Sequence, residues 1–293
     1  MAAIAAGRRS RPTPRSRPVR SAVLYLCATL YSLFVLLPVV YMILVSLQPA
    51  STAGTTIVPT VWYWRTFVQI WQTVSLAHYL ANSLVISTAT GICSSVLALG
   101  AGYVVARFRF RFRGAFRIGL LATNTIPGIL LLLPLYVGFV VIHDTIGLLL
   151  VGTYYGVVIT YMTFALPFSI WMLSVYIVNL PVDLEEQAMV DGAGRIAVLR
   201  WITFPLAIPG MVVTFIFSFL LSWNDVLYAE VLTNQSTRTL GVALQYYASQ
   251  TFSQPQWNEL MGASVVSAIP AVLLFMVVQR WIVTGLASGS IKG

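Results

Sequence analysis

The sequence predicts an all-α integral membrane protein with six transmembrane helices, because of its composition, its long apolar runs and the placement of its arginines. Of the 293 residues, 58% are hydrophobic and 9% are charged. A soluble domain carries about a quarter charged residues and less than half apolar ones. The composition therefore excludes a soluble enzyme, and it also excludes a disordered or fibrous chain.

The apolar runs define the predicted spans, because a helix needs about 20 mostly apolar residues to cross the hydrocarbon core. Runs of that length, with the fourth trimmed from a longer one, lie at 21–47, 79–106, 118–142, 150–178, 201–224 and 260–279. The first run follows several arginines, as the core of a signal peptide does. At 27 residues it exceeds the ~7–15 residues of such a core, which favours a retained membrane anchor.

The arginines indicate the orientation of the spans. Fifteen of the 17 basic residues fall in segments on one side of the predicted membrane, and Arg65 and Arg238 fall on the other. Cytoplasmic segments carry the excess of basic residues, so both termini are expected in the cytoplasm. We expect residues 1–20 to form a disordered basic cytoplasmic arm and residues 21–293 to form the membrane domain.

Two connecting segments carry aromatic residues. Arginine and phenylalanine alternate from Arg107 to Arg113, as in an amphipathic strand or an RNA-binding patch. The favoured interpretation is a short cytoplasmic loop whose phenylalanines enter the membrane interface, so no nucleic-acid partner is expected despite the net charge of +9. On the opposite side, the tryptophans and tyrosine at 62–71 predict a short interfacial helix across 61–72.

The spans lack residues that several membrane activities require. None has an Asp, Glu, Lys or Arg at its middle, which argues against a secondary transporter and against an intramembrane hydrolase. A phosphate loop is excluded because the single lysine is Lys292. His78 and His143 lie at span edges without metal-ligand spacing. No catalytic, cofactor-binding or metal-binding residues are therefore expected.

The cytoplasmic segment 180–209 is predicted to form a helix–turn–helix. Pro181 suits a first helical turn, and the acidic residues after it suit a helix N-terminus. Gly192 and Gly194 end or bend this helix, and a second helix runs from about Arg195 to Thr203. Pro205 then begins the fifth span.

Small side chains on the first of these helices suggest a contact with another protein. Leu184, Ala188 and Gly192 share one face, and Ala193 lies beside it. Such a helix fits deep in a partner's groove while the flanking acids meet basic groups at its rim. A connector that packs only on its own bundle explains the same pattern equally well.

The segment resembles the signature cytoplasmic loop of ATP-binding-cassette (ABC) importer permeases. That signature reads Glu-Ala-Ala, three residues, Gly, nine residues and Ile-x-Leu-Pro. The matching positions are Glu186, Gln187, Ala188, Gly192, Ile202, Phe204 and Pro205, with Gln187 in place of Ala and Phe204 in place of Leu. The Asp191–Ala193 tripeptide matches the Asp-Gly-Ala extension of the carbohydrate branch, in which Leu199 replaces a common Phe.

The resemblance extends over about residues 20–293. Residues 222–225, Ser-Trp-Asn-Asp, are similar to an element near the outer end of the fifth span in this family. Residues 280–293 are similar to the endings of MalG-like subunits of maltose permeases, and Asn82-Ser83 also fits.

The resemblance implies the type I ABC importer permease fold in a bacterial plasma (inner) membrane. It also implies a second permease subunit, two ATP-binding subunits that hold ATP and magnesium, and an extracytoplasmic solute-binding protein. The chain itself would be a transport subunit and not an enzyme, with an oligosaccharide or disaccharide as cargo. Glycerol phosphate or a glycerophosphodiester is the alternative cargo. Coupling to the ATPase through the loop at about 180–204 would involve Glu185, Glu186, Ala188, Asp191, Gly192, Ala193 and Pro205.

Sugars are held by aromatic faces and hydrogen-bonding side chains, which suggests a set of residues along the substrate path. These candidates are Asn82, Asn124, Tyr136, Trp223, Asn224 and Asp225. Hydrogen bonding between helices or anchoring at the interface explains each of them equally well.

Overall fold

The computed structural model describes residues 17–250 and 256–289, with side chains from residue 21 to 250 and from 256 to 279. All regular structure in these residues is helical. The predicted arm lies outside the described residues up to residue 16, whereas residues 17–20 already belong to the first helix. The tail at 280–293 that resembles MalG-like subunits has no described side chains.

Six of the helices are long and apolar enough to cross a membrane, as the sequence predicts. They are α1 (Arg17–Ser46), α3 (Leu76–Arg107), α5 (Ile129–Ile146), α6 (Tyr154–Val178), α9 (Phe204–Asn224) and α12 (Trp257–Gly289). Shorter helices connect them: α2 (Thr66–Thr73), α4 (Arg113–Ala122), α7 (Val182–Val190), α8 (Arg195–Val198), α10 (Leu227–Leu232) and α11 (Leu240–Gln250). Two further turns are the 3₁₀ helix η1 (Thr123–Thr125) and the π-helix η2 (Leu199–Thr203).

The third span differs from the prediction. Instead of one helix at 118–142, α4 and η1 end before Pro127 and α5 begins at Ile129. A proline disfavours helical geometry in the residue before it, and Ile126 is extended with ψ 122°. The side chains of Thr123 and Asn124 donate to the carbonyl of Leu120 at 2.8 and 3.2 Å. The break is therefore stabilised by its own polar residues.

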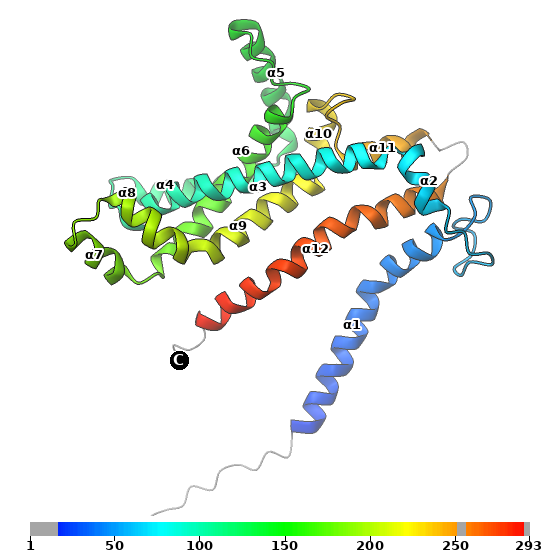
Figure 1. Cartoon of the computed structure of the whole chain (residues 1–293), viewed down its shortest axis with the longest axis horizontal. Coiled ribbons are helices and arrows are strands. Elements are labelled where there is room, and N and C mark those ends of the chain that lie inside the picture. The colour runs from blue at the N-terminus through cyan, green and yellow to red at the C-terminus, as the bar shows by residue number, and fades with distance from the viewer. Residues whose placement is uncertain (1–16, 251–255, 290–293) are drawn as a thin grey trace, which may run out of the picture.

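Helices α3, α6 and α9 form the centre of the bundle (Figure 1). In the most apolar part of α3, 44% of the residues are buried, against 6% in α1 and 6% in α5. Helix α12 contacts both α1 and α9, while α5 projects away from the central helices (Figure 1). The apolar faces of α1 and α5 are thus left for lipid or for a neighbouring membrane protein.

The central helices approach closely because small and hydroxyl-bearing residues lie between them. The Ser87 hydroxyl of α3 donates to Ser222 of α9 at 3.1 Å, and Ser169 of α6 lies 3.3 Å from Ser218 of α9. A side chain added at Gly102 of α3 would meet the backbone of α6. Small residues permit this spacing in a membrane, where packing and interhelical hydrogen bonds replace the hydrophobic effect.

The connection between α1 and α3 contains a shorter helix than the predicted 61–72. Residues before Thr66 form turns, in which the rings of Trp62 and Trp64 stack with their centroids 6.3 Å apart. Both rings are more than half exposed. The aromatic side chains therefore lie on the surface before α2, where they suit a membrane interface.

We expect Gly102→Ala to destabilise the bundle, because its Cβ would lie 3.1 Å from the Ser174 backbone nitrogen and 3.2 Å from Leu173 Cβ. Overpacking of this kind costs about 1–3 kcal/mol and should lower the midpoint of thermal unfolding in detergent. Gly100→Ala is the matched control, since nothing lies within 4 Å of its Cβ. An equal fall in both variants would contradict close packing at Gly102.

Candidate functional site

The candidate coupling loop consists of α7, a tight turn and α8. Helix α7 follows Pro181, which has φ −57°, and it carries acidic residues in its first turn. At its end Gly192 has φ +92°, the left-handed region that favours glycine. The Gly192 amide donates to Met189 O at 3.1 Å and the Ala193 amide donates to Ala188 O at 2.9 Å. This pair of bonds is a Schellman motif, which ends the helix as predicted.

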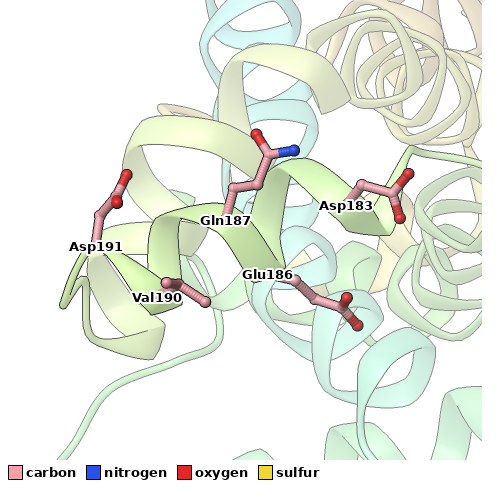
Figure 2. Close-up of a pocket in the computed structure, with 5 residues that line it drawn as sticks. All are labelled: Asp183, Glu186, Gln187, Val190 and Asp191. Carbon is pink, nitrogen blue, oxygen red and sulfur yellow. The ribbon is translucent and has the colours of Figure 1, made fainter.

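One face of α7 is open to the surroundings. Asp183, Glu186, Gln187, Val190 and Asp191 line a shallow depression on it, with the three carboxylates spread along the helix (Figure 2). Val190 is 87% exposed, although it is apolar. The tip of the loop thus combines acidic groups with an uncovered apolar side chain.

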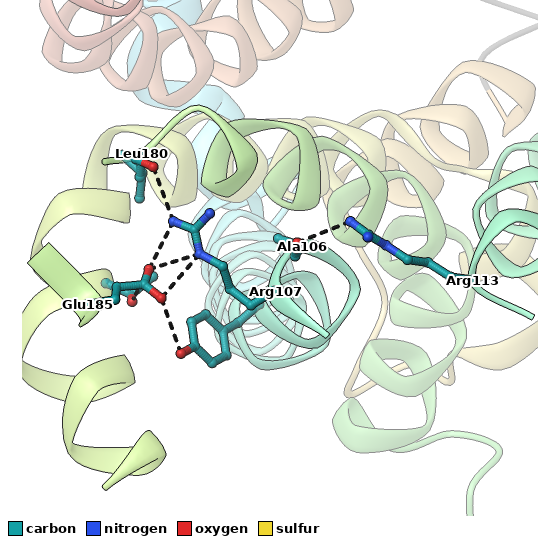
Figure 3. Close-up of polar contacts among 7 residues, drawn as sticks. Ala106, Arg107, Arg113, Leu180 and Glu185 are labelled. Atoms are coloured by element: carbon teal, nitrogen blue, oxygen red, sulfur yellow. Dashed lines mark hydrogen bonds and ion pairs between the residues drawn. The ribbon is translucent and has the colours of Figure 1, made fainter. Parts of the chain in front are cut away.

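Glu185 lies on a different face of α7 from the exposed acidic candidates Glu186 and Asp191. Its side chain is buried and forms an ion pair with Arg107, whose Nη2 lies 2.9 Å from Glu185 Oε1 (Figure 3). Arg107 Nε also donates to both carboxylate oxygens, at 3.0 and 3.1 Å. Glu185 therefore contacts the bundle of its own chain and is not part of the exposed face. A role of Glu185 in coupling would therefore act through the bundle and not through direct contact with a partner.

The remaining loop candidates lie around the turn. Ala188 and Ala193 are half-buried, while Pro205 is exposed in the first turn of α9. The predicted second helix continues directly into the fifth span, since α8, η2 and α9 follow one another without a break. Movement of the loop would therefore act directly on α9.

At the other end of α9, Asp225 organises the start of α10. Its Oδ2 accepts from the Tyr161 hydroxyl at 2.8 Å and from the backbone amides of Tyr228 and Ala229 at 3.0 and 3.2 Å. Burial raises the pKa of Asp225 above the ordinary carboxyl value, and these hydrogen bonds only partly oppose the increase. The Asp225 side chain caps α10 and joins it to α6. Its Oδ2 is therefore already hydrogen-bonded within the chain.

Asn82 is also occupied within the chain. Its Nδ2 donates to the carbonyls of Ser236 and Arg238 at 2.9 Å each, and its Oδ1 accepts from the Tyr154 hydroxyl at 2.8 Å. It is buried near the N-terminal end of α3. These bonds favour the structural alternative that the sequence left open for Asn82.

The other path candidates lie in separate places. Trp223 and Asn224 line a small groove with residues of α11 and α12, and the Trp223 ring stacks on Phe219 at 5.5 Å. Asn124 lies in another groove at the break of the third span, beside Phe164 of α6. Tyr136 packs on an apolar cluster between α5 and α6. The structure thus does not gather the six candidates into one site within this chain.

Residues that sequence reasoning missed hold these elements together. Arg107 and Thr203 bind Glu185, and Tyr161 binds Asp225. The sequence places Arg107 among the basic loop residues. It directly follows the apolar run 79–106, and a charge buried at the end of such a run needs a partner of opposite charge. Among the described residues, no group of His, Cys, Asp or Glu is arranged to hold a metal ion.

Residues 96–288 match the family described as "Binding-protein-dependent transport system inner membrane component". The chain is 34% identical over 263 residues to the trehalose transport system permease protein SugB of Mycobacterium tuberculosis, covering 89% of this chain and 93% of SugB. It is 31% identical to the trehalose/maltose transport system permease protein MalG of Thermococcus litoralis, covering 95% and 99% of the two chains.

A solved structure shares the fold. It is a chain of a bacterial ABC transporter involved in the import of the acidic polysaccharide alginate. The TM-score is 0.73 at 20% identity, covering 92% of this chain and 99% of that chain. The arrangement of helices in Figure 1 is therefore one that ABC importer permeases adopt.

We expect Gly192→Ala to loosen the end of α7, because an alanine with φ +92° is strained by about 1–2 kcal/mol. Amide hydrogen exchange of residues 182–194 should be faster by about 5- to 30-fold. Gly194→Ala is the control, since Gly194 has φ −72° and open space around its Cβ. Similar exchange in the two variants would show that the left-handed turn is not required.

The raised pKa of Asp225 predicts how the pH affects stability. The protonated carboxyl is favoured in the folded chain, so its contribution is complete at low pH and is lost as the pH rises through the raised pKa. Relative to Asp225→Asn, the wild-type chain should lose thermal stability as the pH rises from about 4, the ordinary carboxyl pKa, through the raised pKa of Asp225. Unfolding midpoints that stay parallel across this range would contradict the raised pKa.

Proposed function

Because the chain belongs to the family of binding-protein-dependent transport system inner membrane components, we propose that it is one permease subunit of an ATP-driven sugar importer. A second permease subunit, two ATP-binding subunits and an extracytoplasmic solute-binding protein complete the proposed assembly. The chain lies in the inner membrane of a bacterium with both termini in the cytoplasm. This orientation follows from the arginine distribution.

The observation that carries the coupling role is the exposed face of α7. The side chains of Asp183, Glu186 and Asp191 form no ion pair with any described residue, and Val190 lies uncovered among them. A partner surface with an apolar pocket and basic groups at its rim complements this face. We propose that the ATP-binding subunit provides that surface.

In the proposed mechanism, ATP binding shifts the equilibrium between two arrangements of the bundle. ATP and magnesium bind the partner subunits, and closure of those subunits displaces α7. Because α8, η2 and α9 follow one another without a break, the displacement reaches the fifth span. ATP shifts this equilibrium only through the contacts that differ between the two arrangements.

A sugar is the proposed cargo. SugB and MalG are named for trehalose and for trehalose and maltose, and neither name supports the glycerol-phosphate alternative. Trp223 and Asn224 offer an aromatic ring and an amide in one groove, while Asn124 and Phe164 offer the same pair at the break of the third span. These two grooves are the proposed contacts of this chain along the path, and the second permease subunit supplies the opposite wall.

We expect Glu186→Arg to weaken binding of the ATP-binding subunit by at least about tenfold, because it places a positive charge against the basic rim. ATP hydrolysis stimulated by the assembled permease should fall in parallel. Affinity is measured by biolayer interferometry with the purified permease pair in nanodiscs.

Asp144→Arg is the matched control for this charge reversal. Asp144 lies at the end of α5 with 69% of its side chain exposed. It should bind the ATP-binding subunit as the wild type does. Wild-type affinity in Glu186→Arg would contradict docking through α7.

A further inference from the structure

A buried polar cluster lies under the exposed face of α7. It consists of Glu185, Arg107, Thr203, Tyr103 and the carbonyl of Leu180, and we call it the Glu185 clasp. Thr203 Oγ1 donates to Glu185 Oε1 at 3.1 Å, and the Tyr103 hydroxyl donates to Oε2 at 3.4 Å. Arg107 adds its forked contacts with the carboxylate and a bond from Nη2 to Leu180 O at 3.2 Å (Figure 3).

The clasp joins every element next to the coupling loop. Arg107 and Tyr103 belong to the last turns of α3, Leu180 lies between α6 and α7, and Thr203 is the last residue of η2 before α9. Glu185 is the one member that α7 supplies. Helix α7 is therefore fixed to the inner ends of both α3 and α9 by a single carboxylate.

The contacts are those of a rigid joint. The side chains of Arg107 and Glu185 are 10% and 4% exposed, and they form the one ion pair between buried groups in the described residues. A guanidinium that meets a carboxylate through two donors fixes direction as well as distance. Removal of one member leaves the other charge buried without a partner.

The joint also lies at an irregular point of the backbone. Thr203 ends the π-helix η2, and such wide turns occur frequently at functional sites of helical proteins. From this point α9 runs to Asn224, while α3 runs about 48 Å from Arg107 to Leu76 at 1.5 Å per residue. Asn82 lies near the far end of α3, and the groove lined by Trp223 and Asn224 lies at the far end of α9.

We propose that Arg107 and Glu185 are positioning residues that transmit displacement of α7 to α3 and α9. The inference rests on the proposed function, in which an ATP-binding subunit moves α7. In this proposal, Glu186 and Val190 bind that subunit from the exposed face of α7, while Glu185 transmits the movement to the bundle from the buried face. Adjacent residues on one helix thus have two different tasks.

Stability alone is the competing role for the clasp. Replacing a buried ion pair by apolar residues of similar size often preserves or raises stability. The double variant Arg107→Met/Glu185→Leu therefore separates the two roles, because it leaves no buried charge unpaired and yet removes the directional bonds to Thr203 and Leu180 O.

The experiment measures transmission without knowledge of the cargo. Asn224→Cys is introduced at the outer end of α9 in a background with Cys27→Ser and Cys93→Ser, which removes the two free cysteines of the chain. The full complex with its second permease and ATP-binding subunits is placed in nanodiscs. The rate of labelling by a membrane-impermeant maleimide is compared with and without a non-hydrolysable ATP analogue.

In the parent complex the analogue should change the labelling rate, since α9 moves. In Glu185→Gln and in the double variant, that change should shrink by about threefold to tenfold, while the ATP-binding subunit binds within about twofold of the parent affinity. The thermal midpoint should fall in Glu185→Gln and recover in the double variant. Asp144→Asn is the control and should match the parent in every measurement.

A parent-like labelling change in the double variant would overturn the proposal, because the clasp would then be needed for stability only. A parent-like change in Glu185→Gln would overturn it as well. Failure of the proposed function has a different signature: Glu186→Arg would bind the ATP-binding subunit normally, and the analogue would leave the labelling of the parent complex unchanged.

Discussion

The close approach of α3, α6 and α9 is the constraint on which the rest of the structure depends. In lipid, apolar side chains gain little by meeting one another, so helices associate where small residues and hydroxyl groups allow close contact. Ser87 with Ser222 and Ser169 with Ser218 provide such contacts along α9. The three helices form a frame that carries the loop with α7 at one end and, at the other end, Asn82 and the groove lined by Trp223.

Helix α7 shows how one short segment serves two surfaces. Positions 185 and 186 are adjacent, yet the first side chain is buried against α3 and the second is exposed. The helical period separates them by about 100°, which is enough to bury one side chain against the bundle and leave the next one exposed. A pattern of acidic residues in the sequence does not distinguish a charge that meets a partner from one that holds the helix in place.

Much of the fold was predictable from the sequence, and the failures have physical causes. The six spans follow from the runs of apolar residues, and the turn at Gly192 follows from its glycine. The break before α5 was missed because residues 118–142 form one uncharged stretch, in which the polar residues 123–125 and Pro127 are compatible with a kinked helix as well as with an interrupted one. Arg107 as the partner of Glu185 and Tyr161 as the partner of Asp225 were missed because they lie 78 and 64 residues away along the chain.

The sparse burial of α1 and α5 has a consequence for biogenesis. Few of their side chains pack within the chain, so the neighbouring protein or lipid sets where these two helices come to rest. We expect the central helices to pack first and the two outlying helices to be fixed on assembly. A copy that meets no neighbour would then keep two poorly packed helices in the bilayer.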